Sequence, residues 1–244
     1  MYTLCNSNEY IFIFERYMRI FNEEIRKMKK ITALLLVLAM AVALCACGSS
    51  TDSSTPAADT AASDAAPAAE TLVMGTSADY APFEFMYPDA DGNMVYGGID
   101  VSVAQYVADY TGKELKVENM GFDYLLASLQ KGDFDIVIAA MEATEERQNA
   151  ADFSDPYYTD LPPVILVKAS NADKYKTVDD INQASVIIGA QKNTTKAMAA
   201  ADMFPDAANG MVLESLVPTL VTELKNGTID LLVLDGNVGL SYVG

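Results

Sequence analysis

Arg147 has the side chain best suited to hold a carboxylate. It lies in the segment MEATEERQNAADFSDPYY (residues 141–158), and no other arginine follows Cys47, where lysines supply the remaining positive charges. A planar guanidinium can hold a carboxylate through two parallel hydrogen bonds, which an ammonium cannot do. The sequence therefore predicts a carboxylate at Arg147. That carboxylate belongs either to a bound ligand or to a surface ion pair with Glu142 or a nearby aspartate.

The composition excludes several kinds of chemistry. The chain has no histidine, which excludes Ser-His and Cys-His nucleophiles and most zinc sites. Of 16 Lys and Arg, six precede Cys47, and of 34 Asp and Glu, four do, which leaves 10 basic and 30 acidic residues and a charge near −20. This charge disfavours nucleic acid and anionic lipid as partners. We therefore expect a non-covalent function that needs no cofactor and no metal ion.

The residues from Met28 to Cys47 follow the order of a secreted lipoprotein. Two lysines precede an apolar run from Ile31, and LCAC (residues 44–47) resembles a bacterial lipobox. We expect a signal peptide at 28–46, lipidation of Cys47, and a location at the cell surface or in the periplasm, anchored to the cell membrane. An uncleaved transmembrane helix is the alternative, which the shortness of the apolar run disfavours.

The segments on either side of this signal have different explanations. Residues 1–27 match no targeting signal, so we expect translation to start at Met28 and the upstream residues to be a wrong extension. Residues 47–70 are small and polar, and they bury too little apolar area to offset chain entropy, which indicates a flexible linker. All three cysteines precede Gly48, so no disulfide is expected in the globular part.

Short sequence patterns predict the strands and helices between residues 71 and 132, which must position Arg147. TLVMGT (residues 71–76) and ELKVENM (114–120) predict strands, and the DG pair in DADGNMVYGG (89–98) predicts a hairpin. A helix is expected from Asp100, as its N-cap, to Gly112, and a shorter helix ends at Gly132. The longer helix would bury one face, formed by Val103, Val107 and Tyr110.

An internal repeat predicts two similar α/β lobes. LASLQKGDFDIVIAA (126–140) matches VTELKNGTIDLLVLD (221–235) in its order of helix, glycine stop and continuous apolar run, although the match can also be coincidence. Apolar runs of this kind fit buried parallel strands, and ligands bind beyond the carboxyl ends of such strands. The strand ends expected to meet are Ser77, Ala140, Gln191 and Asp235.

Five strings, in this order, resemble one family. They are LVMGTSADYAPFEF, GIDVSVA, MGFDYLLASLQKGDFDIVIA, TEERQNAADFSDPYY and GAQKNTT. They are similar to the extracellular solute-binding proteins of family 3, the polar amino-acid-binding lipoproteins of ABC importers, and the similarity extends from Thr71 to Gly244. The resemblance implies a two-lobed α/β periplasmic-binding-protein clamp in which each lobe is a mostly parallel sheet flanked by helices. The implied partners are a free amino acid and an ABC transporter permease, and the protein is expected to be a monomer.

The resemblance also implies roles for residues at matching positions. Arg147 would hold the α-carboxylate of the amino acid, and Thr195, at the start of a helix, would contact the same carboxylate. Asp235 would bind the α-ammonium, together with the backbone carbonyl of Ala140. Two aromatic residues would sandwich the ligand side chain, with core packing as the alternative for both: Tyr80 and Phe122.

Three positions depart from the family pattern. Ser77 lies where relatives often have an acid that binds a cationic side chain, which disfavours a Lys, Arg or His ligand. Glu142 replaces a Ser or Thr that donates a hydroxyl near the ligand carboxylate, so an ionised Glu142 would repel the ligand unless it turns outward or pairs with Arg147. Asn193 replaces a common glycine, which is a mild change because asparagine tolerates the left-handed region.

The family pattern gives boundaries and alternative functions. We expect lobe 1 at 71–158, a hinge at 159–161 and lobe 2 at 162–244, and because relatives continue beyond LDGNVGLSYV we expect a C-terminally truncated clamp. One alternative is a prephenate- or arogenate-type dehydratase on the same fold, with Glu142 as a general acid. The other alternative is a ligand-sensing receptor domain.

Overall fold

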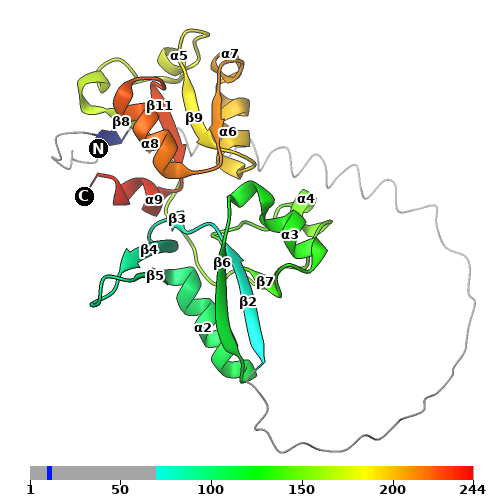
Figure 1. Ribbon diagram of the computed structural model, residues 1–244. Helices are drawn as coiled ribbons and strands as arrows, with labels where there is room; N and C mark the ends of the chain where they lie inside the picture. Colours follow the sequence, from blue (N-terminus) through cyan, green and yellow to red (C-terminus); the bar gives the residue numbers. More distant parts are fainter. Residues whose placement is uncertain (1–9, 13–69, 244) are drawn as a thin grey trace, which may run out of the picture. The chain divides into compact units, whose positions relative to one another are not determined.

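Two sheets, one of three strands and one of five, position the pocket described below (Figure 1). The structure is a computed structural model that describes residues 10–12 and 70–243. The three-stranded sheet has the order β6-β2-β7, and all of its strands are parallel. Its strands are β2 (Thr71–Thr76), β6 (Glu114–Asn119) and β7 (Ile136–Val137).

A small antiparallel sheet follows β2 in the chain. It consists of β3 (Asp79–Tyr80), β4 (Glu84–Pro88) and β5 (Met94–Gly97). Gly92 has a φ of 85° in the turn between β4 and β5, a backbone region that glycine enters without a steric penalty. The hairpin predicted from the DG pair is therefore confirmed.

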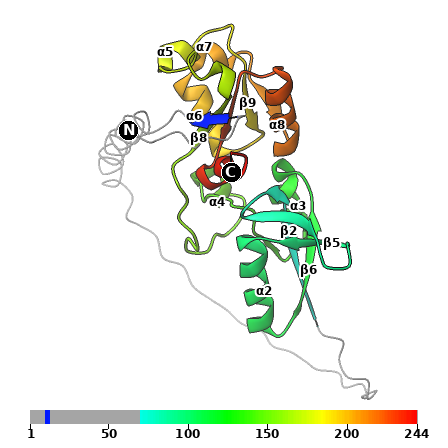
Figure 2. The same ribbon diagram turned by 90° about the vertical axis from the view of Figure 1, so that its left-hand side faces the viewer.

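Helix α2 (Ile99–Thr111) begins and packs differently from the prediction. Its N-cap is Gly98, so the prediction of Asp100 as the cap is wrong. The Asp100 carboxylate is instead buried, and it accepts hydrogen bonds from the Ala140 amide (2.6 Å) and the Tyr157 hydroxyl (2.8 Å). The helix packs along β6 and β2 (Figure 2). Its buried side chains there are small, Ala104 and Ala108, while Tyr110 is 83% exposed.

The two halves of the internal repeat have the same local geometry. Helix α3 (Leu125–Lys131) ends at Gly132 with φ 81° and ψ 19°, and helix α8 (Val217–Asn226) ends at Gly227 with φ 81° and ψ 20°. Each helix is followed by a parallel strand, β7 or β11 (Leu231–Leu234). The two strands differ in burial, because β11 is buried throughout whereas the two residues of β7 are only partly buried.

The five-stranded sheet has the order β1-β8-β11-β9-β10. Strands β9, β11 and β10 are parallel, and β8 runs antiparallel to β11. Strand β1 pairs antiparallel with the other side of β8, a pairing that the sequence analysis did not predict. The remaining bounds are β1 (Tyr10–Phe12), β8 (Val164–Lys168), β9 (Ile188–Gln191) and β10 (Val212–Glu214).

Alternating residues of β11 build two cores on opposite faces of this sheet. Leu232 and Leu234 pack with the buried side chains of α8, whereas Leu231 and Val233 pack with Phe204 and the helices on the other face. Those helices are α5 (Val178–Ile181), α6 (Thr195–Met203) and α7 (Pro205–Ala208), and α9 (Gly236–Ser241) follows β11. No helix among the described residues is long and apolar enough to cross a membrane.

The expectations for the N-terminal region fall largely outside the described residues. The upstream segment 1–27 is described only at residues 10–12, and the signal peptide 28–46, Cys47 and the linker are not described before Glu70. From Glu70 to Val243 the described residues belong to one compact unit.

Candidate functional site

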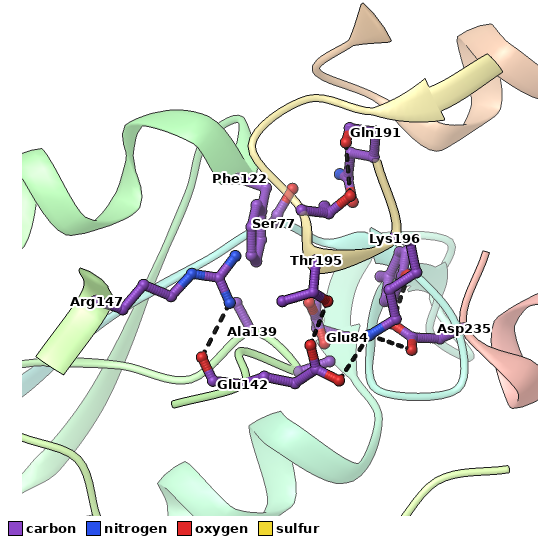
Figure 3. A pocket seen from close by; sticks show the side chains of 13 residues that line it. Ser77, Glu84, Phe122, Ala139, Glu142, Arg147, Gln191, Thr195, Lys196 and Asp235 are labelled. Carbon is purple, nitrogen blue, oxygen red and sulfur yellow. Dashed lines mark hydrogen bonds and ion pairs between the residues drawn. The ribbon is translucent and has the colours of Figure 1, made fainter. Parts of the chain in front are cut away.

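The ends of four strands line one pocket (Figure 3). Ser77 follows β2, Ala140 lies three residues beyond β7, Gln191 ends β9 and Asp235 follows β11. The meeting of strand ends that the repeat predicted is therefore present in the structure. The cavity has a volume of about 10 Å³, which is room for about one water molecule. The other lining residues are Tyr80, Glu84, Phe122, Ala139, Glu142, Arg147, Thr194, Thr195 and Lys196.

Arg147 is a buried cation whose hydrogen-bond partners are uncharged. It is 8% exposed and lies on the short helix α4 (Glu145–Gln148). Its guanidinium donates to the backbone carbonyls of Glu142 (3.0 Å) and Asn193 (2.9 Å). No carboxylate of the described residues forms an ion pair with it, so the alternative of a surface ion pair is wrong. Burial lowers the pKa of Arg147, since the charged form loses hydration.

The aromatic residue beside Arg147 is Phe122, on the 3-10 turn η1 (Phe122–Tyr124). The Arg147 Cζ atom lies 5.3 Å from the centroid of the Phe122 ring, a distance at which a ring face attracts a cation. Phe122 also packs against the small core of Leu125 and Phe134. It thus lines the pocket and contributes to the core.

A turn before helix α6 supplies the second carbonyl for Arg147. Asn193 has a φ of 60°, which is the left-handed conformation expected for this position. Thr194 is the N-cap of the helix, and its hydroxyl accepts from the Ala197 amide at 3.1 Å. The helix begins at Thr195, as predicted.

Glu142 forms an ion pair that the sequence analysis did not foresee. Its Oε1 lies 2.9 Å from Nζ of Lys196, and its Oε2 accepts a short hydrogen bond from the Thr195 hydroxyl. Burial acts to raise the pKa of Glu142, but the Lys196 charge and these hydrogen bonds outweigh it, so the pKa is lowered. The expected pairing of its carboxylate with Arg147 is wrong, because the ion-pair partner is Lys196. The side chain nevertheless stays 53% exposed, so it does turn partly outward.

Asp235 also pairs with Lys196. Its Oδ1 lies 2.5 Å from the Lys196 Nζ, and its Oδ2 accepts a hydrogen bond from the Tyr80 hydroxyl at 2.8 Å. Burial and the adjacent Asp235 charge raise the pKa of Tyr80 well above its usual value, which keeps the hydroxyl protonated as a donor. The Tyr80 ring stacks on Phe83 with centroids 6.3 Å apart, so Tyr80 belongs to the core as well as to the pocket.

Lys196 is the ion-pairing member of the lining residues that sequence reasoning missed, and the others are Glu84, Ala139 and Thr194. Its side chain is 7% exposed and bridges two carboxylates, one following each sheet. One signal was available in the sequence. Lys196 is the second residue of a helix, where a cation opposes the helix dipole, so its presence there points to nearby acids.

The wall near Ser77 combines a buried hydroxyl with buried carboxyl groups. Ser77 is buried, and its hydroxyl donates to Asp79 (3.0 Å), whose other oxygen accepts from the Val217 amide (2.7 Å). Glu84 is 1% exposed, and its Oε2 has no hydrogen-bond partner among the described residues. Burial, together with the nearby Asp100 charge, raises the pKa of Glu84 well above its usual value, so this carboxyl favours its uncharged form.

Ala140 lies on the pocket wall with a φ of 46°, which is uncommon for alanine. The Asp100 carboxylate holds its amide, and this hydrogen bond fixes the local backbone. Among the described residues no group of three or more acidic, cysteine or histidine side chains is arranged to hold a metal ion.

The match to a family model agrees with this geometry. The model of the bacterial extracellular solute-binding proteins, family 3, matches residues 72–208, which is more than half of the chain. The chain therefore belongs to this family, and the resemblance seen in the five strings is confirmed.

Individual relatives are similar over much of their length. The arginine-binding extracellular protein ArtP of Bacillus subtilis (strain 168) is 31% identical over 215 residues, which cover 88% of this chain and 76% of ArtP. Among solved structures, one relative is an amino acid ABC transporter substrate-binding protein from Streptococcus pneumoniae Canada MDR_19A with bound L-arginine. It is 37% identical with a TM-score of 0.66, and the match covers 70% of this chain and 69% of the S. pneumoniae chain.

A second solved structure has a comparable similarity. The ancestral amino acid-binding protein AncCDT-1, a precursor of cyclohexadienyl dehydratase, is 37% identical with a TM-score of 0.64, over 70% of this chain and 73% of its own. With the sheets described above, these structures confirm the expected α/β two-lobed periplasmic-binding fold.

Proposed function

We propose that this chain captures an α-amino acid with an uncharged polar side chain outside the cell membrane and delivers it to the permease of an ABC importer. The observation that carries the proposal is Arg147, a buried guanidinium bonded only to carbonyl groups among the described residues. A buried cation with uncharged partners gains most from an anion that can accept two hydrogen bonds, and the α-carboxylate is such an anion. The arginine-binding relatives bind ligands that carry the same group.

The side-chain class follows from the wall near Ser77. A cationic ligand side chain needs an ionised acid, but Ser77 offers a hydroxyl, and the raised pKa of Glu84 favours an uncharged carboxyl there. A neutral polar side chain finds hydrogen-bond partners on this wall without an unpaired charge. The side chain of glutamine has this polarity.

A thermal-shift screen tests the proposal. The full-length gene product is heated with each of the twenty amino acids, because a ligand that binds only the folded protein raises its melting temperature. A neutral polar amino acid should give the largest shift, and the shift should disappear in Arg147→Ala. If no amino acid shifts the wild type, the proposal is wrong.

We propose a binding function without turnover. A dehydratase that used Glu142 as a general acid would need a protonated carboxyl near neutral pH. Lys196 and Thr195 instead lower the pKa of Glu142 and favour its ionised form. Incubation with prephenate or arogenate should therefore release no product, and product formation would establish the dehydratase instead.

The anchoring of the protein is a separate part of the proposal. We expect a monomer whose attachment to the cell membrane is the lipid on Cys47. Cys47→Ser should release the protein into the medium or periplasm, which fractionation of cells would detect. A variant that remains in the membrane fraction would indicate an uncleaved helix.

A further inference from the structure

Lys196 places an ammonium group inside the candidate binding pocket (Figure 3). Its Nζ lies 2.5 Å from Oδ1 of Asp235 and 2.9 Å from Oε1 of Glu142, and its side chain is 7% exposed. A free α-ammonium would form the same hydrogen bonds with the same two carboxylates. The chain thus supplies from its own side chain the group that an amino acid would bring.

Both carboxylate oxygens of Asp235 already have a partner. Its Oδ1 pairs with Lys196, and its Oδ2 accepts the Tyr80 hydroxyl at 2.8 Å. The cavity of about 10 Å³ has room for about one water molecule, so the pocket must widen for a ligand of any kind. A second ammonium at Asp235 would in addition be repelled by the charge of Lys196. One ammonium must leave before another can take its place.

Lys196 can leave with little obstruction. It lies at the second position of helix α6, where the helix dipole opposes a cation. Its partner Glu142 is 53% exposed, so the flexible lysine side chain can keep this ion pair while it releases Asp235.

We propose that Lys196 is a tethered competitor of the ligand, which occupies the ammonium-binding place in the unliganded protein and exchanges with the α-ammonium when an amino acid binds. This inference rests on the proposed amino-acid function. It makes Lys196 a specificity-determining residue. Only a ligand with an α-ammonium has to displace Lys196 from Asp235, so only such a ligand loses affinity to this competition. An α-hydroxy acid with the same side chain can use Arg147 while Lys196 stays on Asp235.

A charge-matched double variant of the full-length protein tests this inference. Lys196→Met with Glu142→Ser removes one positive and one negative charge, so the net charge of the pocket is unchanged. Calorimetry compares wild type and variant with L-glutamine, L-histidine and L-arginine, and with the α-hydroxy acid that corresponds to each. The change at Glu142 acts on the carboxylate that both ligand types share, so the hydroxy acids serve as the reference. The affinity of the variant for each amino acid should rise about tenfold more than its affinity for the matching hydroxy acid, because the fraction of protein with a free ammonium place rises.

Other results would contradict the inference in distinguishable ways. If the affinity for the amino acids rises no more than the affinity for the hydroxy acids, Lys196 is no competitor, while the amino-acid function stands. If neither protein binds any amino acid, the proposed function fails and the inference fails with it.

A measurement on the wild type covers the case in which the variant does not fold. The Cε signal of Lys196, assigned in the NMR spectrum by its loss in Lys196→Arg, should shift when a bound amino acid saturates the protein. An unchanged signal at saturation would overturn the exchange.

Discussion

The pocket has two buried cations in opposite electrostatic situations. Arg147 is 8% exposed and donates to two carbonyls, whereas Lys196 is 6% exposed and lies between two carboxylates. A buried charge is stable only when its partners replace the lost hydration. Lys196 has such partners within the chain, whereas Arg147 has only carbonyl dipoles and the Phe122 ring. We therefore propose that the Arg147 end of the pocket selects an anion. The difference teaches that burial of a cation does not mark a ligand anchor unless its counter-charge is missing.

The largest loss of ligand affinity is expected at Arg147, the cation without a counter-charge. Arg147→Ala leaves the ligand carboxylate unpaired in a desolvated site, a loss of about 2–5 kcal/mol. At about 1.4 kcal/mol per factor of ten, binding should weaken roughly thirtyfold to several-thousandfold. Arg147→Lys keeps the charge without the planar fork and should restore part of the affinity. Calorimetry on the full-length protein measures both variants.

The control for net charge is Lys113→Ala. This surface lysine lies 3.4 Å from the exposed Glu70, and its removal should leave the affinity unchanged. If Arg147→Ala binds the ligand as tightly as wild type does, Arg147 is not the ligand anchor, and the proposed difference between the two cations is wrong.

A smaller loss of ligand affinity is expected at Asp235, which pairs with Lys196. Asp235→Asn keeps the shape of the side chain but loses the charge that binds an ammonium, a change of about 1.5–3 kcal/mol. Amino-acid binding should weaken roughly tenfold to a hundredfold by calorimetry. The α-hydroxy acid should be almost unaffected. Asp133→Asn, in the exposed turn after α3, is the matched control, and an equal loss for both ligand types would contradict the assignment of the ammonium to Asp235.

The comparison of the two cations assumes that Glu84 adds no negative charge to the pocket. The pH dependence of stability tests this assumption. Burial and Asp100 raise the pKa of Glu84 above its unfolded value. The folded state therefore binds a proton that the unfolded state loses first, so this group destabilises the protein increasingly as the pH rises above about 4.5. Glu84→Gln removes the titration but keeps a hydrogen-bond donor.

The melting temperature of Glu84→Gln relative to wild type should therefore be higher at pH 8 than at pH 4.5. Each pKa unit of the shift corresponds to about 1.4 kcal/mol. Curves for the two proteins that run parallel across this range would show that Glu84 is ionised in the folded protein.

The smallest effect is expected at Asn193. Its φ of 60° is accessible to glycine, and the carbonyl that accepts from Arg147 belongs to the backbone. Asn193→Gly should change the free energy of unfolding by less than about 1 kcal/mol in urea titrations. A large loss of stability or of affinity would assign the Asn193 side chain a role that its backbone does not explain.

Local signals in the sequence predicted much of the fold. Gly112, Gly132 and Gly227 each end a helix in the left-handed conformation, as expected, because this choice depends on one residue and its neighbours. The DG hairpin and the continuous apolar run of β11 were also predicted, since both express turn chemistry and burial within a few residues. Arg147 was singled out by residue type, because only a guanidinium has that geometry.

The charges in the pocket were decided by the tertiary structure. Asp100 looked like a helix cap, but it holds an amide 40 residues away. Glu142 turns partly outward, one of its two predicted alternatives, but its ion-pair partner was not predicted: this is Lys196, 54 residues away. The energy of a buried charge depends on which groups surround it in space, and residue spacing along the chain does not give those distances. The sequence by itself determined where the strands end and which cations are present, and only folding decided which cation has a counter-charge.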